Sequence, residues 1–150
     1  GIIYDMPVFI DYEDPLIEKN TSSVAGRTNT VRTGMIMLDH YGYTPGFYSN
    51  LSWANKLYDA RALQAEGYDF WLARWPSSTS NTNPDPSQHG WNGSPLTLWQ
   101  YTSHGYLPGI SGLGGRVDMN YCYKSYSFKP IASAITACVI SWVISSRRVA

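Results

Sequence analysis

Short apolar runs alternate along the chain with segments of helical spacing, an order typical of a sheet whose strands are joined by helices. Runs with strand character are expected within residues 2–13 and at residues 46–50, 68–75, 96–103 and 115–123. These runs carry polar or aromatic residues toward their ends, namely Asp11 and Glu13, Tyr48 and Asn50, Arg74, Gln100, and Asp118 and Asn120. Parallel α/β barrels build their sites at the C-terminal ends of the strands, so this repeated placement favours a functional site there.

Two segments have apolar residues at helix-like spacing. They predict helices over residues 30–41 and 51–66, which Gly42 and Gly67 end. These helices alternate with the first three strands, and we therefore expect a parallel α/β organisation. The other long connections have no apolar period and are expected to be loops, at residues 14–29 and 76–95.

The sequence PVFIDYED places two carboxylates, Asp11 and Glu13, on the same face of an apolar strand as Phe9. Burial and like charge both favour the neutral carboxyl group, so one member of the pair can stay protonated while the other ionises. Glycoside hydrolysis uses such an acid beside an anion. The alternative is a strand that runs out into solvent, with Asp11, Glu13 and Asp14 as its polar end.

Composition narrows the function further. The length of 150 residues suits one domain with a sizeable core. The formal net charge is zero, so we expect neither a nucleic-acid groove nor a polybasic membrane surface. Six Trp and twelve Tyr suit sugar rings, although they also serve ordinary cores. The histidines and the two cysteines, Cys122 and Cys138, lack metal-ligand spacing, so we expect no metal or cofactor, and the disulfide state stays open.

Five motifs follow one another in the order PVFIDYED, GFYSN, FWLARW, LTLWQYTS and GRVDMNYCY. The series resembles glycoside hydrolase family 25, the Chalaropsis-type lysozymes, which are muramidases found in bacteria and as phage endolysins. The resemblance covers residues 1–126. It implies an α/β fold of the irregular TIM-like (β/α) barrel kind. It also implies cleavage of the β-1,4 bond between N-acetylmuramic acid and N-acetylglucosamine in peptidoglycan, by a protein secreted to the cell wall or released at lysis.

The resemblance also assigns roles to residues. Glu13 matches the glutamate of the family's Asp-x-Glu motif and would be the general acid that protonates the leaving oxygen. Asp11 would stabilise the positive charge that develops at the sugar, or orient the substrate N-acetyl group. Tyr48 matches a tyrosine at the barrel mouth, and Asp118 matches an aspartate of the last strand near the sugar. Whether the reaction retains or inverts the anomeric centre stays open.

Weaker candidates for sugar contacts are Trp71, Trp99 and Gln100. Their alternative is core packing for the two tryptophans and a buried amide for Gln100. In the long loop, His89 and Trp91 are further candidates, unless the loop is only a disordered surface segment.

The chain departs from the family in length. A barrel of this kind takes about 200 to 250 residues. In the family, roughly half of the barrel, with an aspartate on its first strand, normally precedes the Asp-x-Glu strand. Residues 1–126 are therefore expected to be a partial catalytic domain, from strand four onward and without that aspartate. Open strand edges should leave the isolated chain weakly active or inactive, and dependent on an N-terminal half or on self-association. The alternative function is a truncated remnant that binds sugar without turnover.

Residues 127–150 form an apolar tail outside the resemblance. Their apolar stretch, residues 131–144, is shorter than the roughly 20 residues of a membrane span. It would cover the open barrel edge, lie at a membrane interface, or have no selected role. We expect the peptidoglycan glycan strand as the partner, and neither nucleic acid nor a membrane.

Overall fold

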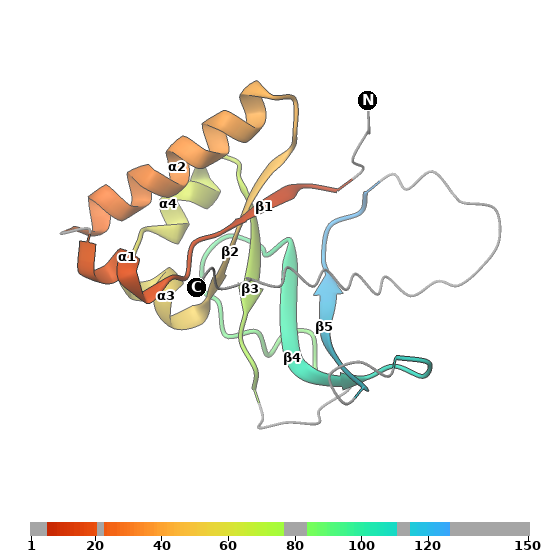
Figure 1. Ribbon diagram of the computed structural model, residues 1–150. Helices are drawn as coiled ribbons and strands as arrows, with labels where there is room; N and C mark the ends of the chain where they lie inside the picture. The colour runs from red at the N-terminus through yellow and green to blue at the C-terminus, as the bar shows by residue number, and fades with distance from the viewer. Residues whose placement is uncertain (1–5, 21–22, 77–83, 111–114, 127–150) are drawn as a thin grey trace, which may run out of the picture.

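The computed structural model describes residues 6–20, 23–76, 84–110 and 115–126. Five strands form one sheet in the order β1-β2-β3-β4-β5, and the helices lie along one side of its first strands (Figure 1). The strands are β1 (Val8–Asp11), β2 (Pro45–Asn50), β3 (Asp69–Ala73), β4 (Leu98–Tyr106) and β5 (Arg116–Cys122). The helices are α1 (Pro15–Asn20), α2 (Val24–His40), α3 (Leu51–Lys56) and α4 (Ala60–Ala65).

The sheet is parallel from β1 to β4, which confirms the parallel α/β organisation predicted for the first three strands. The last strand, β5, instead runs antiparallel to β4. Only residues 107–115 connect these two strands, and a parallel pair needs a crossover of a dozen or more residues. The expectation that all five strands end at one edge therefore fails for β5. Within the described residues, β1 and β5 are the edges of an open, curled half-barrel.

The helical content differs from the prediction in two places. Residues 14–29, expected to be a loop, contain α1 and the start of α2, which Ser23 caps by accepting a hydrogen bond from the backbone N–H of Gly26 at 3.0 Å. The expected helix over residues 51–66 is two helices. Asp59 interrupts it, because its carboxylate caps α4 by accepting from the backbone N–H of Ala62 at 2.9 Å.

Both predicted helix-ending glycines are confirmed. Gly42 and Gly67 follow α2 and α4 with φ of 81° and 95°, a left-handed conformation that glycine adopts without steric cost. The described part of the chain contains no helix that is long and apolar enough to cross a membrane. The apolar stretch at residues 131–144 lies outside the described residues.

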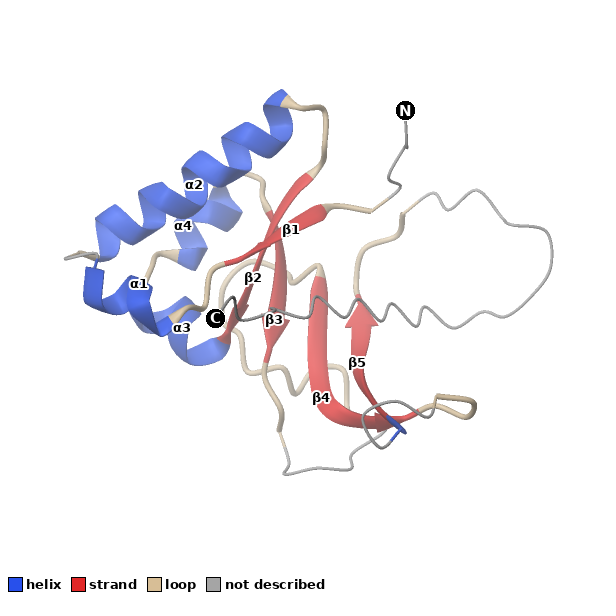
Figure 2. Ribbon diagram, in the orientation of Figure 1, coloured by secondary structure: helices blue, strands red, loops and turns tan. Residues whose placement is uncertain are grey.

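The two faces of the sheet have different neighbours. On the helix side, Phe47 of β2 stacks on Phe70 of β3 with ring centroids 4.5 Å apart, and both are fully buried with Met35 of α2. Figure 2 shows the helices on this side of the strands. The next residue of each strand, Tyr48 and Trp71, points to the opposite face, because successive side chains alternate. That face is free of helices in the described structure, and it carries the candidate site.

Candidate active site

Glu13 lies just beyond the C-terminal end of β1, beside the end of β2. Its Oε1 accepts two hydrogen bonds from Asn50, one from the backbone N–H at 2.5 Å and one from the side-chain amide at 2.6 Å. Asn50 also caps α3, because its Oδ1 accepts from the backbone N–H of Trp53 at 3.0 Å. The turn from β2 into α3 therefore determines where the Glu13 carboxylate lies.

The environment of Glu13 acts on its pKa in both directions. Burial raises this pKa most, and the nearby charge of Asp11 raises it further, while the two hydrogen bonds from Asn50 lower it; the net direction is upward. The pKa of Asp11 is also raised, because neighbouring groups displace water from it although it ends the strand exposed. The pKa values of both carboxyl groups are therefore raised.

A second polar network spans β2, β4 and β5. The buried Gln100 is its centre: its Oε1 accepts from the Tyr48 hydroxyl at 3.5 Å and from the Trp75 indole N–H at 3.2 Å. Its amide nitrogen donates to Asp118 Oδ2 at 3.3 Å. The structure therefore brings three predicted site residues, Tyr48, Gln100 and Asp118, into one network.

Burial raises the pKa of two titratable groups in this network. Burial raises the pKa of Asp118, and the positive charge of His104 partly offsets the increase. Burial and the nearby carboxylates also raise the pKa of Tyr48, so its hydroxyl remains protonated and can donate. The face therefore presents carboxyl groups with raised proton affinity around a neutral hydrogen-bond donor.

Trp71 lies on the same face as Tyr48. Its indole N–H donates to Asn120 Oδ1 at 2.8 Å, and its ring packs edge-on against Phe9 and Tyr48, with centroids 5.4 Å and 5.1 Å away. Phe9 was predicted to share one face of β1 with Asp11 and Glu13. Its contact with Trp71 shows that this face of β1 is turned toward the site. Trp71 is thus one of the aromatic residues that make up the site face of the sheet.

Trp99 does not reach this face. Its side chain is fully buried in the core, its N–H donates to the carbonyl of Arg74 at 2.7 Å, and its ring stacks on Tyr121. The core-packing alternative therefore describes Trp99, since its neighbour Gln100 takes the site side of β4. The same correction applies to Trp91, which is buried in the core and donates to Gln64. His89 lies half-buried with its ring near Trp99.

A pocket of about 430 Å³ opens at the C-terminal ends of β2 and β3. Glu13 lines it, together with residues of the β2–α3 turn and of the end of β3: Tyr48, Asn50, Leu51, Ser52, Ala73, Arg74 and Trp75. The predicted general acid thus borders a space of the size that small ligands occupy. Within the described part of the chain, no cluster of three or more His, Cys, Asp or Glu residues is arranged to hold a metal ion.

Sequence reasoning did not single out Trp75, which lines the pocket. About half of its side chain is exposed, and its indole N–H is anchored on Gln100, so one ring edge is fixed while the ring borders the pocket. Its position as the last residue of the strand predicted over residues 68–75 was the available signal. The signal was weak because a tryptophan at the end of a strand packs in a core as readily as in a site.

The comparisons with known proteins show the family to which the chain belongs. A model of glycosyl hydrolases family 25 matches residues 3–110, which is more than half of the chain. The chain belongs to glycosyl hydrolases family 25, and the resemblance that the five motifs indicated is confirmed. No curated protein matches the chain in sequence.

Three solved structures resemble the fold. A bacterial lysozyme from Streptomyces coelicolor matches with a TM-score of 0.57 and 22% identity, over 79% of this chain and 51% of the lysozyme. A mutant of the modular Cpl-1 endolysin, complexed with a peptidoglycan analogue, matches with a TM-score of 0.51 and 21% identity, over 63% of this chain and 26% of the endolysin. The CTP1L endolysin matches with a TM-score of 0.50 and 19% identity, over 79% of this chain and 35% of the endolysin. The chain thus spans about half, or less, of each structure.

Proposed function

We propose that this chain carries the acid half of a muramidase site, which cleaves the β-1,4 bond between N-acetylmuramic acid and N-acetylglucosamine. The observation that carries the proposal is the position of Glu13: a carboxyl group with a raised pKa, held by Asn50 at the wall of a pocket in a family 25 chain. The complex of the Cpl-1 endolysin with a peptidoglycan analogue supports the substrate class. Such an enzyme acts at the cell wall, either secreted or released at lysis.

The hydrogen bonds of Glu13 support its role as the general acid. Both bonds from Asn50 end on Oε1, so Oε2 is the oxygen that carries the transferable proton. When the proton passes to the leaving glycosidic oxygen, a carboxylate forms. The two Asn50 donors are already in place to stabilise that carboxylate.

Asp11 and Asp118 supply negative charge to the same face. An oxocarbenium-like transition state develops positive charge at the sugar, which a nearby carboxylate stabilises. Asp11 follows Phe9 on the site face of β1, and Asp118 joins the network through Gln100. We assign charge stabilisation to Asp11, or orientation of the substrate N-acetyl group if that group is the nucleophile. Tyr48, Gln100, Trp71 and Asp118 would contact the sugars.

Release of reducing ends from purified peptidoglycan tests the proposal. Glu13→Gln should lower any turnover by about 10²- to 10⁴-fold, since general acid catalysis contributes that much. The matched control is Glu66→Gln, which makes the same change at a surface ion pair with Arg32. Equal release by Glu13→Gln and the parent chain would contradict the role of Glu13.

A second candidate function is sugar binding without turnover. It is favoured by the aromatic residues of the site, since Trp75 borders the pocket with about half of its side chain exposed and Trp71 packs against Tyr48 on the same face. Two results together would establish this second function. The soluble parent chain would bind glycan without releasing reducing ends, and the Glu13→Gln variant would bind glycan with the same affinity as the parent chain.

A further inference from the structure

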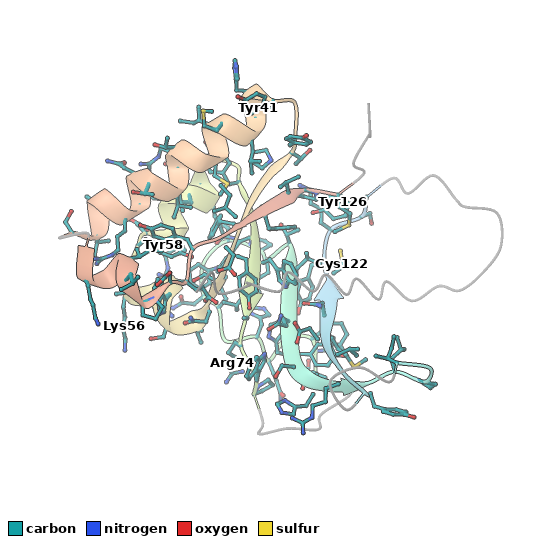
Figure 3. All side chains as sticks on the ribbon, in the orientation of Figure 1. Tyr41, Lys56, Tyr58, Arg74, Cys122 and Tyr126 are labelled. Carbon is teal, nitrogen blue, oxygen red and sulfur yellow. The ribbon has the colours of Figure 1, made fainter. Side chains whose placement is uncertain are left out.

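The pocket beside Glu13 has a positively charged wall that the proposed acid chemistry does not use. Arg74 follows β3 directly, is partly buried, and lines the same pocket as Glu13 and Trp75. Figure 3 labels it beyond the C-terminal end of β3. General acid catalysis on a neutral glycosidic bond needs no fixed cation, so Arg74 calls for a separate explanation.

The surroundings of Arg74 hold it in place. Its backbone N–H donates to the carbonyl of Gln100 at 3.1 Å, and its own carbonyl accepts the indole N–H of Trp99 at 2.7 Å. One guanidinium nitrogen, Nη1, donates to the carbonyl of Gln88. Gly90 lies against the guanidinium, where a Cβ would be 3.4 Å from the guanidinium carbon, and its φ of 73° is a left-handed conformation that favours glycine. The guanidinium is therefore positioned before any ligand arrives.

The charge of Arg74 is not neutralised by a carboxylate within the described residues, where the ion pairs are Arg32 with Glu66 and Lys124 with Asp69. Glu13 borders the same pocket, but the hydrogen bonds to its Oε1 come from Asn50. A guanidinium has five N–H donors in a planar fork, and the bond to Gln88 uses one nitrogen. The remaining donors have the geometry that binds a carboxylate through two parallel hydrogen bonds.

We propose that Arg74 binds a carboxylate carried by the glycan strand and thereby selects muramic-acid-containing strands over uncharged ones. This inference rests on the proposed function, because it names the part of the substrate that the same pocket recognises. Peptidoglycan carries carboxylates in two places: the lactyl group of a muramic acid without a stem, and the stem peptide where one is attached. A chain of N-acetylglucosamine alone carries none. The fixed charge of Arg74 therefore distinguishes these strands.

Binding of three tetrasaccharides to the full chain tests the proposal, measured by isothermal titration calorimetry. The first is chitotetraose, without a carboxylate; the second alternates N-acetylglucosamine with stem-free muramic acid; the third carries stem peptides. The chain should bind one of the two charged ligands about tenfold more tightly than chitotetraose. The ligand that binds more tightly identifies the source of the carboxylate. Repeating the titrations with Glu13→Gln prevents loss of ligand through turnover.

Two substitutions and one control separate recognition from a structural role. Arg74→Gln should bring the preferred charged ligand to the affinity of chitotetraose, while Arg74→Lys, which keeps the charge without the fork, should retain part of the preference. Arg116→Gln makes the same charge change at an exposed β5 residue outside the pocket lining and should change nothing. Arg74 also donates to the carbonyl of Gln88, so its replacement can change the loop as well as the charge. The salt dependence of binding to the parent chain tests the charge without a substitution. Added salt should weaken binding of the charged ligand to the parent chain and leave chitotetraose unaffected.

The outcomes are distinct. Equal affinity of the parent chain for all three tetrasaccharides would overturn the proposal that Arg74 binds a carboxylate. An equal loss of affinity for all three in Arg74→Gln would overturn it as well. Either result would still agree with a cleft that binds sugar. If none of the three binds to the soluble parent chain, the proposed function fails, and the inference fails with it.

Discussion

The side chain of Asn50 connects Glu13 to α3, since its amide N–H₂ donates to Glu13 Oε1 at 2.6 Å while its carbonyl accepts the backbone N–H of Trp53 at 3.0 Å. The residue that caps the helix is thus the residue that positions the proposed acid. Any change in the conformation of the β2–α3 turn changes the hydrogen bonding of Glu13 as well.

Asn50→Ser should raise the pKa of Glu13. Serine preserves a capping oxygen for α3 but removes the side-chain amide donor, which is one of the groups that lower this pKa. The titration of the Glu13 carboxyl carbon, followed by NMR in both proteins, measures the change. Asn55→Ser, on the exposed side of α3, is the control and should leave that titration unchanged. A lower Glu13 pKa in Asn50→Ser would refute the assigned direction.

The pH profile of any turnover should depend on Asp11. A general acid must be protonated, so the rate falls as the pH rises through the pKa of Glu13. Asp11→Asn removes a negative charge that raises this pKa, so the alkaline limb should shift to lower pH. Initial rates across the pH range locate the limb. A limb at the same pH in both proteins would show that Asp11 does not act on Glu13 electrostatically.

Asp11 should also make folding stability depend on pH. Its pKa in the folded chain is raised, so between the unfolded value of about 3.9 and the folded value the folded state binds more protons, and stability falls as the pH rises. Asp11→Asn should therefore gain stability relative to the parent chain at pH 7, and lose that advantage below the unfolded pKa. Urea unfolding at neutral and acid pH measures the difference.

Asp85→Asn should change the pH dependence of stability in the opposite direction to Asp11→Asn, because the pKa of Asp85 is lowered in the folded chain. Two hydrogen bonds from Ser87 lower the pKa of Asp85, so its carboxylate stabilises the fold above the unfolded pKa and stops doing so as the pH falls. This variant should lose stability relative to the parent chain at pH 7 and approach it in acid. The same sign for both variants would be inconsistent with the assigned shifts.

Trp75→Ala should weaken sugar binding about three- to tenfold, because the ring that borders the pocket supplies an apolar face to a sugar ring. Trp75→Phe keeps a face but loses the N–H bond to Gln100, so its effect should be intermediate. Titration with a tetrasaccharide measures both variants. Tyr41→Ala removes a more exposed aromatic side chain next to the end of α2 and should have no effect. Undiminished binding by Trp75→Ala would exclude a sugar contact.

The correct and incorrect parts of the sequence prediction have physical causes. The strands were predicted because they are apolar on the face that packs on the helices. The first turns of α2 were missed because that segment is polar: the residues it buries include Arg27 and Thr28, which satisfy their polar atoms inside the fold, Arg27 through the carbonyl of Leu57. The break at Asp59 was missed because Thr28, from a distant segment, accepts its backbone N–H.

The sequence by itself determined the family and the alternation of each strand, and it supplied the prediction that Asp11 and Glu13 form the acid pair, because motif order and a period of two are local properties of the chain. Only the tertiary structure decided which aromatic residues reach the site. Trp71 and Trp99 occupy similar strand sequences, yet Trp71 lies on the site face, where its indole N–H donates to Asn120, while Trp99 is buried among core rings. The pairing of β3 with β4 sets this difference, because it aligns Trp71 with Leu98 and Leu72 with Trp99. A slip of one residue would turn every side chain of a strand to the other face, so the packing of the whole sheet against the helices fixes the register.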